Sequence, residues 1–138
     1  MVMEMIKPEI LIVDDISENL RFLSSILLKN GYTVRAAING PLAISSAKAA
    51  IPDLILLDIK MPDMDGYEVC RRLKSIPEIQ HVPVIFISAL GELEDKVKAL
   101  NAGGVDYITK PFQLEEVLAR VGTHLHLRSL QKQMERLN

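Results

Sequence analysis

The stretch LILLDIKMPDMDGYEVC, residues 54–70, contains the pattern on which the fold prediction rests. Its first four residues are an apolar run without polar alternation, which is typical of a strand buried on both faces of a sheet. The loop MPDMDG that follows is rich in turn signals. Val69, Leu73 and Ile76 then recur at helical spacing. The stretch therefore predicts a buried strand, a loop that contains acidic residues, and a helix with one apolar stripe.

The same order of elements recurs on both sides of this unit. Buried runs occur as ILIV at 10–13 and VIFI at 84–87, and weaker strand candidates are YTVRA at 32–36 and DYIT at 106–109. Stretches with helical spacing lie between them. Five strands that alternate with helices are most economically arranged as a parallel sheet with right-handed crossovers. We therefore predict an α/β fold, a flavodoxin-like doubly wound five-stranded parallel sheet with strand order 2-1-3-4-5.

The run NGPLAISSAKAA, residues 39–50, predicts one of the helices that lie close to this sheet. Asn39 is a typical N-terminal cap residue and an early proline follows it. The small residues Ala43, Ala47 and Ala50 occupy the positions where we expect the helix to approach the strands.

Composition limits the classes of function. The 138 residues are 49% hydrophobic, which fits one domain with one core. The net charge of −2 and the absence of a basic cluster interleaved with aromatics argue against nucleic-acid binding by this segment. The single cysteine, Cys70, fits a reducing compartment, so we expect a cytoplasmic location. No apolar run approaches the roughly 20 residues that span a bilayer, so we expect no membrane partner.

Polar residues follow the predicted strands at one edge of the sheet. Asp14 and Asp15 come after the first strand, Asp58 ends the third, Ser88 ends the fourth, and Lys110 follows the fifth. Each alone could be structural, since acids and serines commonly cap helices at such loops. Because the carboxyl ends of parallel strands share one rim, we expect all five to converge. Three adjacent carboxylates repel one another unless a cation lies among them, and an all-oxygen site suits Mg²⁺.

This set of residues predicts phosphoryl transfer. Mg²⁺ beside a carboxylate, a lysine and a hydroxyl neutralises charge on the moving group and places the nucleophile in line. A carboxylate can be that nucleophile, which gives an acyl phosphate. Asp58 is the predicted phosphorylation site because it lies centrally in the sheet. Lys110 would pair with one phosphoryl oxygen and the Ser88 hydroxyl would donate a hydrogen bond to another, so these three are the candidate catalytic residues.

The motifs ILIVDD at 10–15, LILLDIKMPDMDGYEVC at 54–70, VIFISAL at 84–90 and DYITKPF at 106–112 form an ordered set. With this set the chain resembles a receiver domain of the two-component response regulators over nearly its whole length. The resemblance implies that a phosphohistidine on a sensor histidine kinase or a histidine phosphotransfer protein is the phosphoryl donor. It also implies a regulatory phosphoacceptor domain that switches conformation to control an output, and that is not an enzyme beyond its own Mg²⁺-dependent phosphoryl transfer and slow hydrolysis.

The resemblance assigns further roles to single residues. The metal ligands would be Asp15, Asp58 and the backbone carbonyl of Lys60, with Asp14 contributing through water. In receiver domains the hydroxyl matched by Ser88 moves toward the phosphoryl group and the aromatic matched by Tyr107 turns inward behind it, so these two residues are the predicted switch.

Two residues near the site, Pro111 and Ser88, differ in how they match the family: the first follows the family pattern and the second departs from it. The bond that precedes Pro111 matches a bond that is cis in the family. Ser88 stands where threonine is more usual, which preserves the hydroxyl and removes a methyl group. We therefore expect the switch to operate.

The alternatives to a phosphoacceptor domain include an aspartate-based phosphatase and a dimerisation scaffold. An aspartate-based phosphatase of the haloacid dehalogenase type needs a second acid two residues after the nucleophile, and Lys60 stands there instead. A receiver-like domain could also serve only as a dimerisation scaffold that is never phosphorylated. The presence of every residue needed for phosphorylation argues against that reading.

The C-terminal segment predicts an extended helix. We expect a receiver domain at residues 1–122 and a helical extension at 123–138 that begins a linker to an absent output domain. His124 and His126 point to different faces of such a helix and are predicted to be ordinary, partly exposed residues. A 3-4-3 apolar spacing, typical of a coiled-coil seam, is formed by Leu127, Leu130, Met134 and Leu137. The extension could therefore pair with its copy in a homodimer, or it could be a terminal helix with a frayed end.

Overall fold

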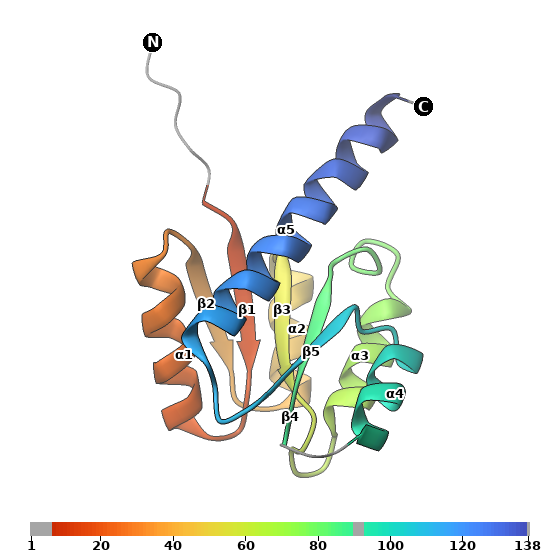
Figure 1. The fold of residues 1–138 in the computed structure, drawn as a ribbon. Coiled ribbons are helices and arrows are strands. Elements are labelled where there is room, and N and C mark those ends of the chain that lie inside the picture. Colours follow the sequence, from red (N-terminus) through yellow and green to blue (C-terminus); the bar gives the residue numbers. More distant parts are fainter. Residues whose placement is uncertain (1–6, 90–92, 138) are drawn as a thin grey trace.

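Five parallel strands form one sheet in the predicted order β2-β1-β3-β4-β5 (Figure 1). The computed structural model describes residues 7–89 and 93–137. The strands are β1 (Glu9–Val13), β2 (Thr33–Ala37), β3 (Leu54–Asp58), β4 (Val84–Ala89) and β5 (Asp106–Lys110). The helices are α1 (Ser17–Lys29), α2 (Gly40–Ala49), α3 (Gly66–Lys74), α4 (Leu93–Asn101) and α5 (Leu114–Leu137).

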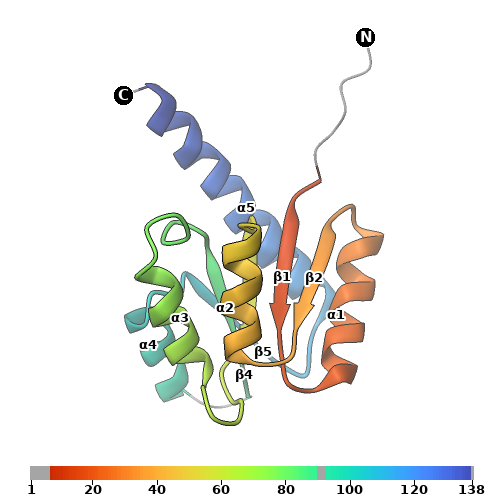
Figure 2. The same cartoon turned by 180° about the vertical axis from the view of Figure 1, so that it is seen from behind.

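The helices cover both faces of the sheet, which explains why the central strands lack polar alternation. β3 pairs with β1 on one side and β4 on the other, and all five of its residues are buried. α1 and α5 cover one face, while α2, α3 and α4 cover the other (Figures 1 and 2). The doubly wound prediction is therefore confirmed.

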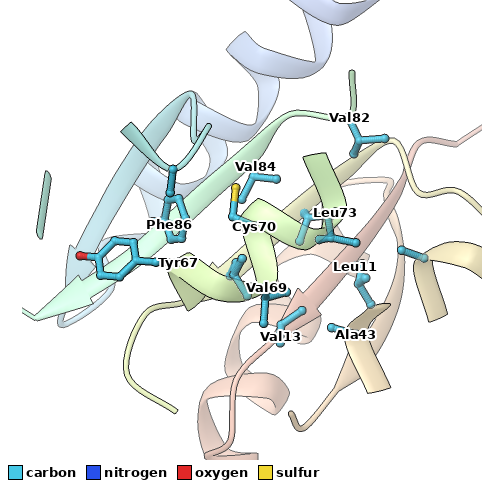
Figure 3. Packing of buried hydrophobic residues seen from close by; sticks show 14 of the residues in the cluster. Leu11, Val13, Ala43, Tyr67, Val69, Cys70, Leu73, Val82, Val84 and Phe86 are labelled. Carbon is cyan, nitrogen blue, oxygen red and sulfur yellow. The ribbon is translucent and has the colours of Figure 1, made fainter. Parts of the chain in front are cut away.

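Alternate residues of each strand point into two separate cores. On the side of α2 and α3, the core includes Leu11, Val13, Val84 and Phe86, and the α3 residues Val69, Cys70 and Leu73 pack against it (Figure 3). On the side of α1 and α5, the core includes Ile10, Ile12, Leu54, Leu56, Ile85, Ile87 and Ile108. These two cores pack both faces of the sheet and so position the carboxyl ends of the strands at one edge.

The N-terminal cap predicted for α2 is present, but one predicted packing residue is wrong. The Asn39 side chain accepts a hydrogen bond from the Leu42 amide at 2.9 Å, and Ala43 and Ala47 are fully buried. Ala50 is exposed and lies one residue beyond the helix. Pro52 explains this end, since the residue before a proline is disfavoured in helical conformation and α2 stops ahead of it.

α5 is the longest helix and its second half extends beyond the sheet, as predicted. Val117 and Val121 are buried under the first half. The rest projects past the amino ends of the strands, away from the edge where the strands terminate (Figure 1). Across residues 7–89 and 93–137, none of the helices has the length and apolar character required to span a bilayer.

Candidate functional site

Three carboxylates lie together at the carboxyl ends of β1 and β3. Asp14, Asp15 and Asp58 each offer an oxygen, and these atoms lie within 4.8 Å of one another. Asp14 is completely buried and Asp58 is 3% exposed, whereas Asp15 faces solvent. The structure thus brings together the acids that the sequence placed after two different strands.

The backbone around the third strand holds Asp58 in place. The amide of Ile59 donates to the Ile87 carbonyl at 3.1 Å, and the amide of Gly66 donates back to the Ile59 carbonyl at 2.8 Å. A Cβ atom on Gly66 would collide with the carbonyl oxygen of Asp58 and would lie 2.9 Å from the Cα atom of Ile59. Glycine therefore allows α3 to begin directly against the end of β3.

Asp14 is fixed by the start of α1. One carboxylate oxygen accepts a hydrogen bond from the Ile16 amide at 2.9 Å, and the other accepts one from Asn19 Nδ2 at 3.0 Å. The Asp14 amide donates to the Ala37 carbonyl at 3.2 Å. These contacts orient the buried carboxylate, while Asp15 next to it keeps access to water.

Lys110 enters the same cluster from β5. Its Nζ atom lies 3.2 Å from Asp58 Oδ1 and 3.8 Å from Asp14 Oδ2. The peptide bond between Lys110 and Pro111 is cis, as the resemblance implied. Lys110 is thus the cation that faces the two buried carboxylates.

The electrostatics of the cluster favour a further cation. Burial, followed by the charge of Asp14, raises the pKa of Asp58 from 3.8 to about 6, against the opposing effect of Lys110. With three carboxylates and one ammonium ionised, the formal charge is −3 + 1 = −2. A divalent cation among these oxygens would neutralise that charge and favour the ionised form of Asp58.

Ser88 supplies a hydroxyl to this edge of the sheet. It lies near the end of β4, where its neighbour Ile87 is in register with Asp58 and it is itself in register with Thr109. Ser88 is 3% exposed, and its Oγ atom has no hydrogen-bond partner among the residues that the structure describes. A buried hydroxyl without a partner is costly, so it is suited to donate to a ligand that enters the site.

The other two predicted site residues, Lys60 and Tyr107, lie in the loop after β3 and on β5. Lys60 is exposed in the loop after β3 and lines a cavity of about 500 Å³ together with Met61, Asp65 and Tyr67. Tyr107 is partly buried on β5, and the Arg120 guanidinium lies 5.6 Å from the centre of its ring.

A polar cluster beside Tyr107 was not predicted. Asp106 accepts hydrogen bonds from Arg120 Nη1 at 2.7 and 2.9 Å, contacts His124 Nε2 at 2.9 Å and accepts from the Tyr107 amide at 2.8 Å. Burial opposes the charge, but these hydrogen bonds together lower the pKa of Asp106. The signal was the spacing of Arg120 and His124, four residues apart on one helix face. The cluster fixes α5 to β5 next to the predicted switch residue.

This arrangement defines a class of protein. A buried carboxylate at the end of a central parallel strand, with two more acids, a lysine and a hydroxyl around it, has the chemistry expected of an α/β phosphoacceptor domain. The chain matches the response regulator receiver domain family over residues 10–122 and belongs to that family. It is therefore a regulatory receiver domain of two-component signal transduction.

Relatives of known sequence support this assignment. The chain is 45% identical over 112 residues to the response regulator PleD of Caulobacter vibrioides, covering 81% of this chain and 25% of PleD. It is 41% identical over 114 residues to RpaA of Synechocystis, a DNA-binding transcriptional regulator, covering 83% of this chain and 47% of RpaA. The chain thus spans between a quarter and a half of the length of these two relatives.

Solved structures show the same fold. The receiver domain of a signal transduction histidine kinase from Syntrophus aciditrophicus is 38% identical with a TM-score of 0.80, covering 86% of this chain and 90% of that one. NtrX from Brucella abortus is 27% identical with a TM-score of 0.90, covering 96% of this chain and 30% of that one.

Proposed function

We propose that Asp58 accepts a phosphoryl group from a phosphohistidine on a sensor histidine kinase or a histidine phosphotransfer protein. A carboxylate oxygen of Asp58 bonds to phosphorus while the phosphorus–nitrogen bond breaks, and the departing imidazole nitrogen takes up a proton from solvent. The observation that carries the proposal is the position of Asp58 at the end of the central strand β3, where Lys110 Nζ lies 3.2 Å from its carboxylate, nearer than the 3.8 Å to Asp14.

The metal proposed for this site is Mg²⁺. Asp15, Asp58 and the backbone carbonyl of Lys60 would hold it, with Asp14 acting through water. Support comes from the three converging carboxylates and from the cluster's formal charge of −2, which together suit a hard divalent cation with oxygen ligands. When bound, Mg²⁺ neutralises charge on the transferred group.

The other residues of the site have separate proposed roles. Lys110 pairs with a phosphoryl oxygen, and the Ser88 hydroxyl, which has no hydrogen-bond partner among the described residues, donates to another. The movement of Ser88 leaves space that Tyr107 enters, and the change reaches α5 through Arg120 and Asp106, which lie beside Tyr107. Phosphorylation would in this way select one of two conformations of β5 and α5.

We also propose how this domain is used in the cell. Residues 1–122 form the receiver and 123–138 begin a linker to an output domain, in keeping with relatives that are two to four times longer than the matched segment. The protein would be cytoplasmic, would form a homodimer, and would bind no nucleic acid through this segment. Its own chemistry would be limited to phosphoryl transfer and slow hydrolysis, without an external substrate.

The proposal is tested by incubating the chain with acetyl phosphate and Mg²⁺ and measuring its intact mass. We expect one phosphoryl adduct on the wild type and none on Asp58→Asn. Asp63→Asn is the matched control, because Asp63 lies in the adjacent loop with a φ of 70°, which asparagine tolerates. Removal of Mg²⁺ with EDTA should abolish the adduct.

Three results would overturn this function. An adduct of equal yield on Asp58→Asn would place the acceptor elsewhere. No adduct on the wild type, together with no binding of beryllofluoride, would leave a dimerisation scaffold as the function. Continuous release of phosphate from phosphoesters would instead favour an aspartate-based phosphatase.

A further inference from the structure

The last part of α5 presents a row of large apolar side chains to solvent. This row, the tail seam, consists of Leu127 (46% exposed), Leu130 (43%), Met134 (62%) and Leu137 (81%). Isolated exposed apolar residues are common, but four at 3-4-3 spacing along one helix are typical of a surface that pairs with another helix.

The opposite face of this part of α5 contacts the rest of the domain. Leu125 packs against the core shared with α1, and Lys132 Nζ lies 3.9 Å from Asp53 Oδ1. Leu125, Ser129 and Lys132 line a cavity of about 200 Å³ with Pro8 and Asp53. At about 100° per residue, the tail seam is centred roughly 160° around the helix from Leu125. The seam therefore turns away from this contact, and its most exposed residues, Met134 and Leu137, point to solvent. Leu127, at the start of the seam, lines a cavity with His81 and Val105 of the domain.

The charges of the tail favour a second copy of this chain as the partner. If the tail seam occupies heptad positions a and d, the flanking e and g positions hold Gln131, His126 and Gln133. All four charged residues occupy positions b, c or f, namely Arg128, Lys132, Glu135 and Arg136. In a pair of identical helices the e and g positions face each other, and like charges there would repel. The uncharged flanks of this tail therefore permit self-pairing.

The tail is already helical in the single chain, so pairing does not have to supply the free energy of forming the helix. Val117 and Val121 anchor the first half of α5 to the sheet, so the fold itself nucleates the helix that continues into the tail. Nucleation is the costly step for a short helix, and here it precedes association. Because the seam covers only two heptads, we expect the association to be weak and to depend on protein concentration.

From these observations we propose that residues 127–137 pair with the same segment of a second copy as a parallel two-stranded coiled coil. The domain lies at one end of the tail (Figure 1), so a parallel pair would place both domains at the same end. An antiparallel pair would bring the free end of one tail beside Leu127 of the other. Leu127 lines a cavity with Val105 and His81, so the incoming tail end would have to fit against the domain there. The proposal rests on the homodimer suggested above but not on phosphorylation of Asp58, so the two can fail separately.

Cysteine cross-linking of the full chain tests the pairing and its direction. The native Cys70 is buried and serves as the unreactive background. Under mild oxidation, Leu137→Cys should form a disulfide-linked dimer at least about tenfold faster than the neighbouring Arg136→Cys, because position d lies in the seam and position c points outward. Equal rates would overturn the proposal. Cross-links that appear only when Leu127→Cys and Leu137→Cys are mixed would show antiparallel pairing and overturn the parallel arrangement.

Sedimentation equilibrium supplies an independent measurement. Met134→Glu places two carboxylates across the seam and should raise the dimer dissociation constant at least about tenfold, while Arg136→Glu should change it less than about twofold. A wild type that is monomeric at every concentration, or a dimer insensitive to Met134→Glu, would overturn the proposal. The acetyl phosphate adduct should form on all of these variants, which separates loss of pairing from loss of the phosphoacceptor site.

Discussion

At the scale of single residues, the surroundings of Asp58 oppose the ionisation of its carboxyl group. Its pKa rises to about 6 because it is buried and lies beside Asp14, although Lys110 partly offsets both effects. A nucleophilic carboxylate must be ionised, and the ionised Asp58 lowers the stability of the metal-free fold. The residue that is needed for the reaction is therefore one that destabilises the protein. Such conflicts between stability and function are typical of active sites.

Replacing Asp58 with asparagine should stabilise the metal-free protein. An unfolded aspartate titrates near 3.8 and the folded one near 6, so the contribution of Asp58 to the free energy of unfolding is full below about pH 4 and is lost as the pH rises to about 6. This rise in the pKa of Asp58 corresponds to at most about 3 kcal/mol of the free energy of unfolding. In EDTA, urea denaturation at about pH 7.5 should show Asp58→Asn to be more stable than the wild type by about 1–3 kcal/mol, and by about half as much near pH 5.

The matched control for this measurement is Asp63→Asn, which lies outside the carboxylate cluster and should change stability little. A wild type and Asp58→Asn of equal stability at both pH values would mean that the cluster does not disfavour the Asp58 charge.

Mg²⁺ should stabilise the wild type through the same cluster. A ligand that binds only the folded state adds about 1.4 kcal/mol at ten times its dissociation constant. We expect this increase in urea denaturation of the wild type near pH 7.5, and little or none for Asp58→Asn or Asp15→Asn. Asp15 is exposed, so its substitution should not disturb the apo fold. If Asp15→Asn gained as much stability from Mg²⁺ as the wild type, Asp15 would not be a ligand.

At the scale of the elements, the buried strands were the part of the fold most open to prediction. ILIV, LILL and VIFI lie within β1, β3 and β4, because strands covered on both faces need apolar residues at every position. The acids were predictable for a related reason: residues that follow parallel strands share one edge. The spacing of Arg120 and His124 indicates one helix face, but that this face contacts Asp106 could not be predicted, since the contact depends on the path of α5 across the sheet. The raised pKa of Asp58 likewise depends on distances that no spacing in the sequence supplies.

The polar link between β5 and α5 gives a prediction at this scale. Asp106→Asn removes the charge that Arg120 and His124 contact, and should lower the free energy of unfolding by about 1.5–3 kcal/mol near neutral pH. The pKa of Asp106 is lowered in the fold, so its contribution is present above about pH 4 and is lost as the pH falls through the folded value. Urea denaturation and amide hydrogen exchange in α5 measure both effects.

Glu116→Gln is the control for this link, because it removes only a partly exposed contact with Arg120 at 3.5 Å. Its effect should stay below about 0.5 kcal/mol. Equal losses in the two variants would show that the Asp106 cluster contributes no more than a surface ion pair.

At the scale of the whole molecule, α5 runs from β5, which carries the predicted switch residue Tyr107, to the tail that we propose to pair. Its first half packs beside β5, next to Tyr107, and its second half leaves the sheet at the end opposite the carboxylate cluster (Figure 1). A change at Tyr107 could therefore reach the tail by rotating or shifting one rigid helix. The residue at which α5 leaves the domain therefore decides how much of the helix would move when a signal is carried to a partner.

Truncation tests where that point lies. The sequence placed the end of the receiver at residue 122, but His124 contacts Asp106 and Leu125 packs against the core. A chain of residues 1–126 should therefore keep a free energy of unfolding within about 1 kcal/mol of the full chain, whereas residues 1–122 should lose about 2–4 kcal/mol. Both should still form the acetyl phosphate adduct, since the carboxylate cluster is intact in each. Equal stability of the two truncated chains would place the boundary at 122, and a large loss in both would make the exposed tail part of the folded domain.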